Sequence, residues 1–121
     1  AETADALADA IGEPGRAHTR YWSDLDGIGR YDMIINATSA GVLGVSLQLP
    51  PSLVGARALC YDLSYGTAAS SFLSWAAAAG ARYAFDGLGM LVETAADAFE
   101  LWHGRRPDTE PVYQALRRQS A

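Results

Sequence analysis

The run Tyr31-Asp32-Met33-Ile34-Ile35-Asn36-Ala37-Thr38 decides the fold class of this chain of 121 residues. Its apolar centre is too continuous for a strand with one face in water, and it is typical of a central strand in a parallel sheet covered on both faces. Residues 58–65 form a second run of this kind and predict another buried strand. Residues 82–85 predict a short third strand.

Helical patterns alternate with these strands. Residues 68–79, which follow a capping Thr67, and residues 88–103 carry apolar side chains at helical spacing. Gly80 and Gly104 are placed where helices end. Strands and helices in alternation predict a parallel α/β layer structure with right-handed crossovers.

The rest of the chain is predicted to contain a helix over 1–12, a short strand over 17–22, a Gly- and Ser-rich loop over 39–55 with a helical turn after Pro51, and a last helix capped by Asp108 or Thr109. The loop exceeds the usual length of a connection, and loops of this length are often functional. The chain has no initiator Met and opens directly into a helical pattern. We therefore expect it to begin partway through something larger.

Composition excludes several classes of protein. With 50% hydrophobic and 19% charged residues, the chain is expected to fold as a globular domain and not to be disordered. A net charge of −5 argues against a nucleic-acid surface, and no apolar run is long enough to predict a membrane span. The nine basic residues are all Arg, so any mechanism that needs a lysine is excluded from this chain.

Cysteine and histidine usage narrows the chemistry further. Cys60 is the only cysteine and cannot form an intrachain disulfide, which favours a cytoplasmic location. His18 and His103 have no partners at ligand spacing, so no metal site is predicted.

The carboxyl ends of the predicted strands define a candidate site, because parallel α/β sheets bind ligands there. These ends are residues 36–39, 62–65 and 86–89. The first is small and polar, which suits either close contact with a planar ligand or a simple loop cap. Residues 87–89, Gly-Leu-Gly, suit either a ligand contact or an ordinary turn between a strand and a helix. The acidic residues of the following helix, Glu93, Asp97 and Glu100, are predicted to form a solvated face.

The sequence resembles shikimate dehydrogenases over essentially all 121 residues. The resemblance is carried by Asp86-Gly87-Leu88-Gly89-Met90-Leu91-Val92 with the helix after it, and by residues 31–41 and 60–65, in the same order and with similar gaps. It implies NADP-dependent interconversion of 3-dehydroshikimate and shikimate in aromatic amino-acid (chorismate) biosynthesis. The implied ligands are small molecules.

The same resemblance implies a partial Rossmann-like, three-layer α/β sandwich with a parallel sheet. Residues 1–121 would be the C-terminal portion of the cofactor-binding domain, and residues 88–121 would form C-terminal helices that pack across the cleft. The family's substrate domain, which carries a catalytic Lys-Asp pair, and its phosphate-binding loop have no counterpart in this sequence. No catalytic residue is therefore assigned here, and this chain alone is expected to be inactive.

The resemblance also implies which residues meet the cofactor. Ala37, Thr38 and Ser39 lie on the strand tip that faces it, and Leu63 stands where the family often has a Met against the nicotinamide. Gly87 matches the glycine whose backbone borders the nicotinamide. A valine in its place is expected to weaken cofactor binding with little change in melting temperature.

Two further residues are implied on the substrate side. Tyr65 matches a tyrosine close to bound shikimate, and Thr94 stands where the family usually has a substrate-binding Gln. Two other functions stay open, namely a quinate dehydrogenase relative and a non-catalytic module that binds a nucleotide or a partner. A homodimer and association with a preceding N-terminal part both stay open as assemblies.

Overall fold

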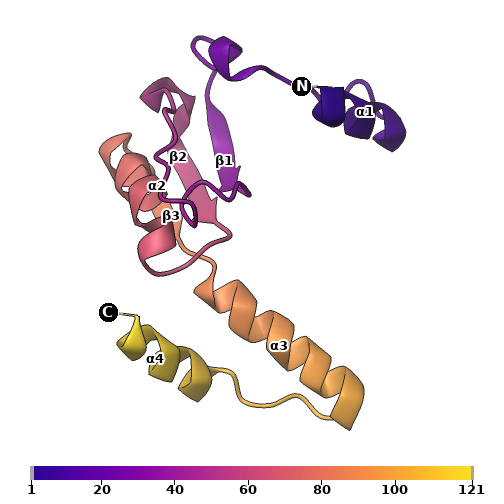
Figure 1. Ribbon diagram of the computed structural model, residues 1–121, viewed down its shortest axis with the longest axis vertical. Coiled ribbons are helices and arrows are strands. Elements are labelled where there is room, and N and C mark those ends of the chain that lie inside the picture. Colours follow the sequence, from indigo (N-terminus) through magenta and orange to yellow (C-terminus); the bar gives the residue numbers. More distant parts are fainter. Residues whose placement is uncertain (1, 121) are drawn as a thin grey trace.

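Three parallel strands form one sheet in the order β1-β2-β3 in the computed structural model, which describes residues 2–120 (Figure 1). They are β1 (Tyr31–Asn36), β2 (Val54–Asp62) and β3 (Tyr83–Phe85). The predicted parallel α/β architecture is confirmed, and β2 begins four residues earlier than the sequence pattern indicated.

Helix α2 (Thr67–Ala78) covers one face of the sheet and closes the core. Successive side chains of a strand point to opposite faces, so alternate residues of β2 point toward α2. The core comprises Val54, Ala58, Cys60, Phe72 and Ala76. Thr67 does not cap α2 as predicted, because it is the first helical residue and Gly66 precedes it at a φ of 62°.

The long loop between β1 and β2 packs onto α2 and ends in a short 3-10 helix, η2 (Pro51–Leu53), which is the turn predicted after Pro51. The indole N–H of Trp75 donates to the Leu49 carbonyl oxygen over 2.8 Å. A methyl group at Gly41 would lie 1.8 Å from the Ala68 carbonyl oxygen, so only glycine lets the loop come this close. The loop therefore forms one wall beside the end of β1.

The opposite face of the sheet is open. Strand register places two rows of apolar side chains on it, Met33 with Leu59 and Tyr83, and Ile35 with Tyr61 and Phe85. Four of these side chains, those of β1 and β3, are about half exposed. The prediction that β1 is a central strand covered on both faces is thus wrong within residues 2–120, where β2 is central and β1 is at the edge. A continuous run of apolar residues indicates that both faces of a strand avoid water. It does not indicate which segment covers them.

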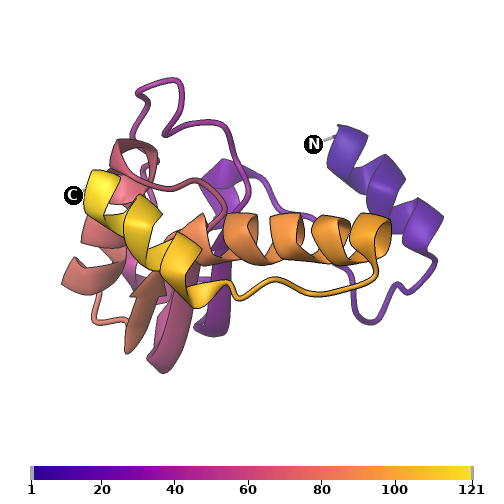
Figure 2. The same cartoon turned by 90° about the horizontal axis from the view of Figure 1, so that it is seen from below.

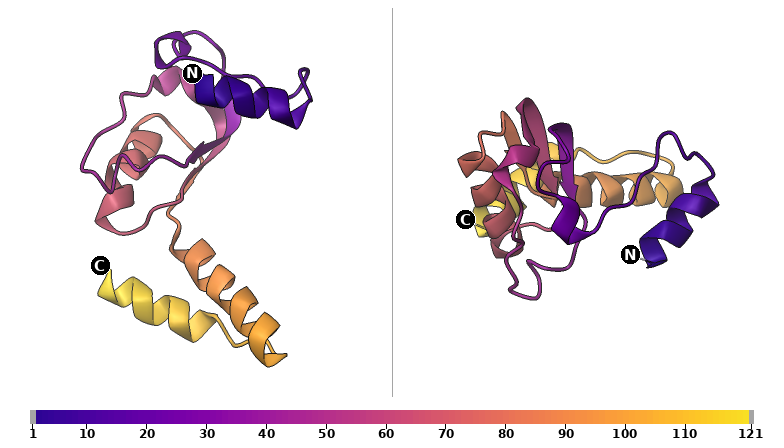
Figure 3. Two further views of the ribbon diagram at one scale, coloured as in Figure 1. Left: turned by 45° about the vertical axis from the view of Figure 1, so that its right-hand side comes forward. Right: turned by 90° about the horizontal axis from the view of Figure 1, so that it is seen from above.

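Helix α1 (Glu2–Ile11) lies apart from the sheet (Figure 3). It ends at Gly12, as predicted, and has no buried residue. The strand predicted over 17–22 is wrong, because no strand forms there and a 3-10 helix, η1 (Trp22–Asp24), follows. A strand needs a neighbouring strand to satisfy its backbone, and strand propensity alone does not supply one.

Helices α3 (Leu88–His103) and α4 (Glu110–Gln119) form a hairpin that leaves the sheet directly after β3 (Figure 2). Helix α3 has its predicted bounds and ends at Gly104 in the left-handed conformation. Thr109 occupies the N-cap position of α4, and the Asp108 carboxylate accepts a hydrogen bond from the Glu110 N–H over 3.2 Å. Thr109, the other predicted cap, makes no capping hydrogen bond with its side chain.

Candidate functional site

The three strand ends meet at one edge of the sheet, and backbone hydrogen bonds connect the segments that follow them. The Leu63 N–H, just after β2, donates to the Asn36 carbonyl oxygen at the end of β1 over 3.0 Å. The Gly87 N–H, just after β3, donates to the Ser64 carbonyl oxygen over 2.8 Å. The segment after β2 is therefore held from both sides, and the predicted site is one continuous edge.

A buried pair of polar side chains joins β1 and β2 at this edge. Asn36 and Asp62 are 6% and 1% exposed, and the Asn36 amide donates to the Asp62 carboxyl over 2.9 Å. The other Asp62 oxygen accepts from the Ser64 N–H over 2.7 Å. Among residues 2–120, no buried side-chain nitrogen or oxygen is left without a partner. Fully satisfied buried networks of this kind make a local structure rigid.

Residues 37–39 extend from the β1 tip and are exposed. Thr38 donates from both its N–H and its hydroxyl to the Asn36 side-chain oxygen, over 3.1 and 2.8 Å. Its hydroxyl also accepts from the Ala40 N–H over 3.3 Å. Thr38 therefore caps the loop, which is one of the two roles that the sequence predicted for this tip. Cofactor contact at Ala37, Thr38 and Ser39 stays a prediction.

Leu63 and Gly87 lie in direct backbone contact. A methyl group added to Gly87 would stand 2.2 Å from the Leu63 carbonyl oxygen and 2.7 Å from its carbonyl carbon. Glycine at this position thus lets the start of α3 press against the segment after β2, while the Leu63 side chain is 40% exposed. The expectation that valine at Gly87 leaves stability unchanged conflicts with this contact, because the side chain would displace backbone.

Tyr65 and Thr94, the predicted substrate residues, both lie at the surface. Tyr65 is 46% exposed and is therefore not a core aromatic. The Thr94 hydroxyl donates to the Met90 carbonyl oxygen over 2.7 Å within α3. Gly87, Met90 and Thr94 are spaced three and four residues apart and so share one face of the helix. Contact of Tyr65 and Thr94 with a substrate stays a prediction.

The third strand end is fixed by an ion pair that the sequence analysis missed. Both Asp86 oxygens accept from the Arg117 guanidinium of α4, over 2.6 and 2.8 Å, and the Asp86 side chain is 8% exposed. The guanidinium is the main reason that the pKa of Asp86 lies below its usual value. The two residues are 31 positions apart, and no local pattern in the sequence connects them.

The acidic stripe on α3 is exposed, as predicted, and it also pairs with an arginine that the sequence analysis did not connect to it. Glu93, Asp97 and Glu100 all accept hydrogen bonds from the side chain of Arg106, in the link between α3 and α4. Hydrogen bonds from Thr109 and Arg106 lower the pKa of Glu93. Exposed ion pairs contribute little stability each, so the main effect is to hold the link against α3.

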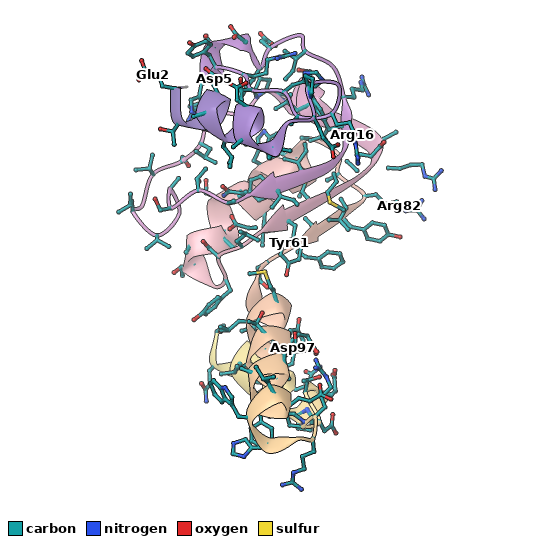
Figure 4. The ribbon with its side chains drawn as sticks, turned by 90° about the vertical axis from the view of Figure 1, so that its right-hand side faces the viewer. Glu2, Asp5, Arg16, Tyr61, Arg82 and Asp97 are labelled. Atoms are coloured by element: carbon teal, nitrogen blue, oxygen red, sulfur yellow. The ribbon has the colours of Figure 1, made fainter. Side chains whose placement is uncertain are left out.

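In the view of Figure 4 the sheet lies between α1 and the α3–α4 hairpin. In that view Tyr61 lies on the sheet near the end from which α3 departs, and Asp97 lies further along α3. No cluster of His, Cys, Asp and Glu suited to a metal ion occurs within residues 2–120. No helix in this part of the chain is long and apolar enough to cross a membrane.

A parallel sheet with small, exposed tips at its carboxyl edge, followed by a helix that starts at a glycine, defines part of a Rossmann-like ligand-binding domain. Comparison with known proteins shows what the chain is similar to. Residues 87–117 match the model of the shikimate 5'-dehydrogenase C-terminal domain. The chain is 56% identical over 117 residues to the shikimate dehydrogenase (NADP(+)) of Xylella fastidiosa strain M12. The resemblance predicted from the sequence is confirmed: residues 87–117 match the C-terminal domain of shikimate dehydrogenases, and nearly the whole chain is similar to part of the Xylella protein.

The Xylella alignment covers 95% of this chain and 42% of the relative, so the chain spans less than half of that protein. Among solved structures, shikimate 5-dehydrogenase of Thermus thermophilus in complex with shikimate has a TM-score of 0.74 and 29% identity, over 98% of this chain and 42% of that one. The 5-ketofructose reductase of Gluconobacter sp. strain CHM43 has the same TM-score with 27% identity, over 98% and 44% of the two chains.

Proposed function

We propose that this chain supplies the nicotinamide-side wall of an NADP-dependent shikimate dehydrogenase, which interconverts 3-dehydroshikimate and shikimate in aromatic amino-acid biosynthesis. The observation that carries the proposal is the joined carboxyl edge, where Leu63 is exposed between the β1 tip and Gly87. The name of the 56% identical relative and a Thermus structure solved with NADP(H) and shikimate support this choice of cofactor and substrate.

The residues at this edge suit a nicotinamide ring. Leu63 offers an apolar surface for the flat face of the ring, and the absence of a side chain at Gly87 lets the start of α3 lie directly beside Leu63. Ala37, Thr38 and Ser39 would border the cofactor from the neighbouring tip. The bound cofactor would supply hydride transfer, while the protein positions it and excludes water.

The substrate would lie against Tyr65 and Thr94. The exposed Tyr65 hydroxyl is free of the core and would hydrogen-bond shikimate. Thr94 is shorter than the usual family Gln, so its hydroxyl would reach the substrate through a water molecule. Proton transfer needs groups outside this chain, which contains no lysine.

Domain boundaries and assembly follow as part of this proposal. Residues 1–121 would form the C-terminal portion of the cofactor domain, with residues 88–121 as its returning helices. The open apolar face of the sheet supports association with a further protein surface, which would belong either to an N-terminal part of the same protein or to a second copy. A cytoplasmic location is supported by the single, buried Cys60, whose burial raises its pKa and keeps the thiol unreactive.

A second candidate is reduction of another polyhydroxylated ketone. It is favoured by the fold similarity to 5-ketofructose reductase, which equals the similarity to the Thermus enzyme. Thr94 in place of the family's usual Gln also favours this second candidate, since it would change the contact with the substrate.

The test is steady-state oxidation of NADPH by the full-length protein with 3-dehydroshikimate, and in parallel with 3-dehydroquinate and 5-ketofructose. We expect kcat/KM for 3-dehydroshikimate to exceed that for the other two ketones by at least about a hundredfold, because a site built for one set of hydroxyls rejects others strongly. The 121-residue chain alone, assayed as a control, is expected to be inactive. A preference for another ketone would replace the first candidate with the second. NADPH binding without turnover of any of the three would favour a non-catalytic module.

A further inference from the structure

The carboxylate of Asp86 connects two parts of the molecule. One of its oxygens accepts from the Leu88 N–H over 3.2 Å, in the first turn of α3. The same carboxylate accepts both hydrogen bonds of the Arg117 guanidinium from α4. A two-pronged pair of this kind fixes the orientation of the carboxylate as well as its position. Helix α4 thereby constrains the start of α3.

Tyr113 extends this contact along α4. Its hydroxyl accepts from Arg117 over 2.8 Å, and the guanidinium carbon lies 5.0 Å from the centre of the Tyr113 ring. Arg117 therefore holds the turn over residues 86–89 at Asp86, and Tyr113 in turn holds the Arg117 guanidinium.

Gly87 lies inside this turn and in contact with the candidate site. Its N–H is bonded to Ser64, and its α-carbon lies against the backbone of Leu63. Asp86 and Leu88 flank Gly87, and the Asp86 carboxylate accepts from the Leu88 N–H. Loss of the orientation of that carboxylate would release this hydrogen bond and loosen the hold on Gly87 beside Leu63. The ion pair is thus placed to set the separation of the two proposed nicotinamide contacts.

We propose that Arg117 and Tyr113 are positioning residues for the cofactor, which act through Asp86 and hold the Gly87 turn against Leu63. This inference rests on the proposed function. The competing explanation is that the pair only fastens α4 to the sheet. A fastener would affect stability alone, whereas a positioning residue also affects cofactor binding.

The experiment uses Arg117→Met in the full-length protein, because Met keeps much of the apolar stem and removes the guanidinium. The control is Arg118→Met, at the exposed neighbouring position on the same helix. We expect KM for NADPH and its dissociation constant to rise about tenfold in Arg117→Met, equivalent to about 1.4 kcal/mol. We expect kcat to change less than about twofold, and the control to match the wild type.

Three further variants separate positioning from fastening. Asp86→Asn keeps an acceptor for the Leu88 N–H but loses the ion pair, so it should reproduce the NADPH effect of Arg117→Met. The two changes should not add in the double variant, because each breaks the same contact. Arg117→Lys keeps the charge without the planar fork and should restore only part of the affinity.

A fall in melting temperature with an unchanged dissociation constant for NADPH would overturn the inference. The ion pair would then only attach α4 to the sheet. This failure differs from failure of the proposed function. In the first case the wild-type protein reduces 3-dehydroshikimate and Arg117→Met binds NADPH normally, and in the second the wild type itself does not act on that substrate.

Discussion

Two junctions hold the carboxyl edge of the sheet, and they differ in burial. Asn36 and Asp62 join adjacent strands through side chains that are almost fully buried. Asp86 and Arg117 join the third strand end to the last helix, and the Arg117 side chain is 38% exposed. The Asp86 side chain is 8% exposed, so water reaches the second junction only from its Arg117 side, and it hardly reaches the first junction at all. The first should therefore determine whether the edge forms, and the second how accurately Gly87 is placed.

The largest expected effect comes from removing the Asn36 amide at the buried junction, which tests whether this junction determines that the edge forms. Asn36→Leu would leave an Asp62 oxygen and the Thr38 donors without their partner, so we expect the free energy of unfolding to fall by about 3 kcal/mol. Urea denaturation of the full-length protein measures this. Ser39→Ala, on the exposed part of the same tip, is the control and should stay within about 0.5 kcal/mol of the wild type. Equal effects of the two substitutions would contradict the contrast.

Gly87→Ala tests the backbone contact between the two junctions. The added methyl group meets the Leu63 carbonyl oxygen, and we expect a loss of about 2 kcal/mol in unfolding free energy, as in other overpacked sites, together with weaker NADPH binding. Gly15→Ala is the matched control, because no atom lies within 4 Å of a methyl group there. Thermal and urea unfolding compare the two variants. An unchanged stability of Gly87→Ala would mean that α3 does not press against Leu63.

Tyr65→Phe separates residues that stabilise the carboxyl edge of the sheet from residues that bind a ligand there. The Tyr65 side chain is 46% exposed, so loss of its hydroxyl should leave unfolding unchanged. If the hydroxyl bonds shikimate, binding should weaken by about 1 kcal/mol, or about fivefold in KM. Thr94→Gln, which restores the usual family side chain, should lower KM for shikimate or leave it unchanged. A lower melting temperature with unchanged kinetics would make Tyr65 a packing residue.

The smallest expected effect is the pH dependence of the junction between Asp86 and Arg117. Arg117 lowers the pKa of Asp86 in the folded state, so the pair stabilises the protein above the unfolded pKa of about 4. That contribution is lost as the pH falls through the lower, folded pKa. The difference in melting temperature between wild type and Arg117→Met should thus be constant from about pH 5 to pH 7 and shrink below pH 4. A difference that persists unchanged below pH 3 would assign the stabilisation to packing.

Local pattern was sufficient for much of the fold. The bounds of α3 followed from apolar spacing and Gly104, and the three strands followed from their apolar runs. Pattern failed at residues 17–22, where a plausible strand has no partner, and at the start of α2, where Thr67 does not act as the cap. In both places the outcome depends on backbone partners that a short stretch of sequence does not contain.

The sequence by itself determined that this chain is a parallel α/β unit, and it placed the candidate site at residues 36–39, 62–65 and 86–89, since periodicity and turn chemistry are local properties. Tertiary structure alone decided that Asn36 meets Asp62, that Gly87 presses against Leu63 and that Arg117 reaches Asp86. These contacts join residues 24 to 31 positions apart along the chain. They form only when the sheet and the α3–α4 hairpin bring their side chains together, and no periodicity in the sequence encodes that meeting.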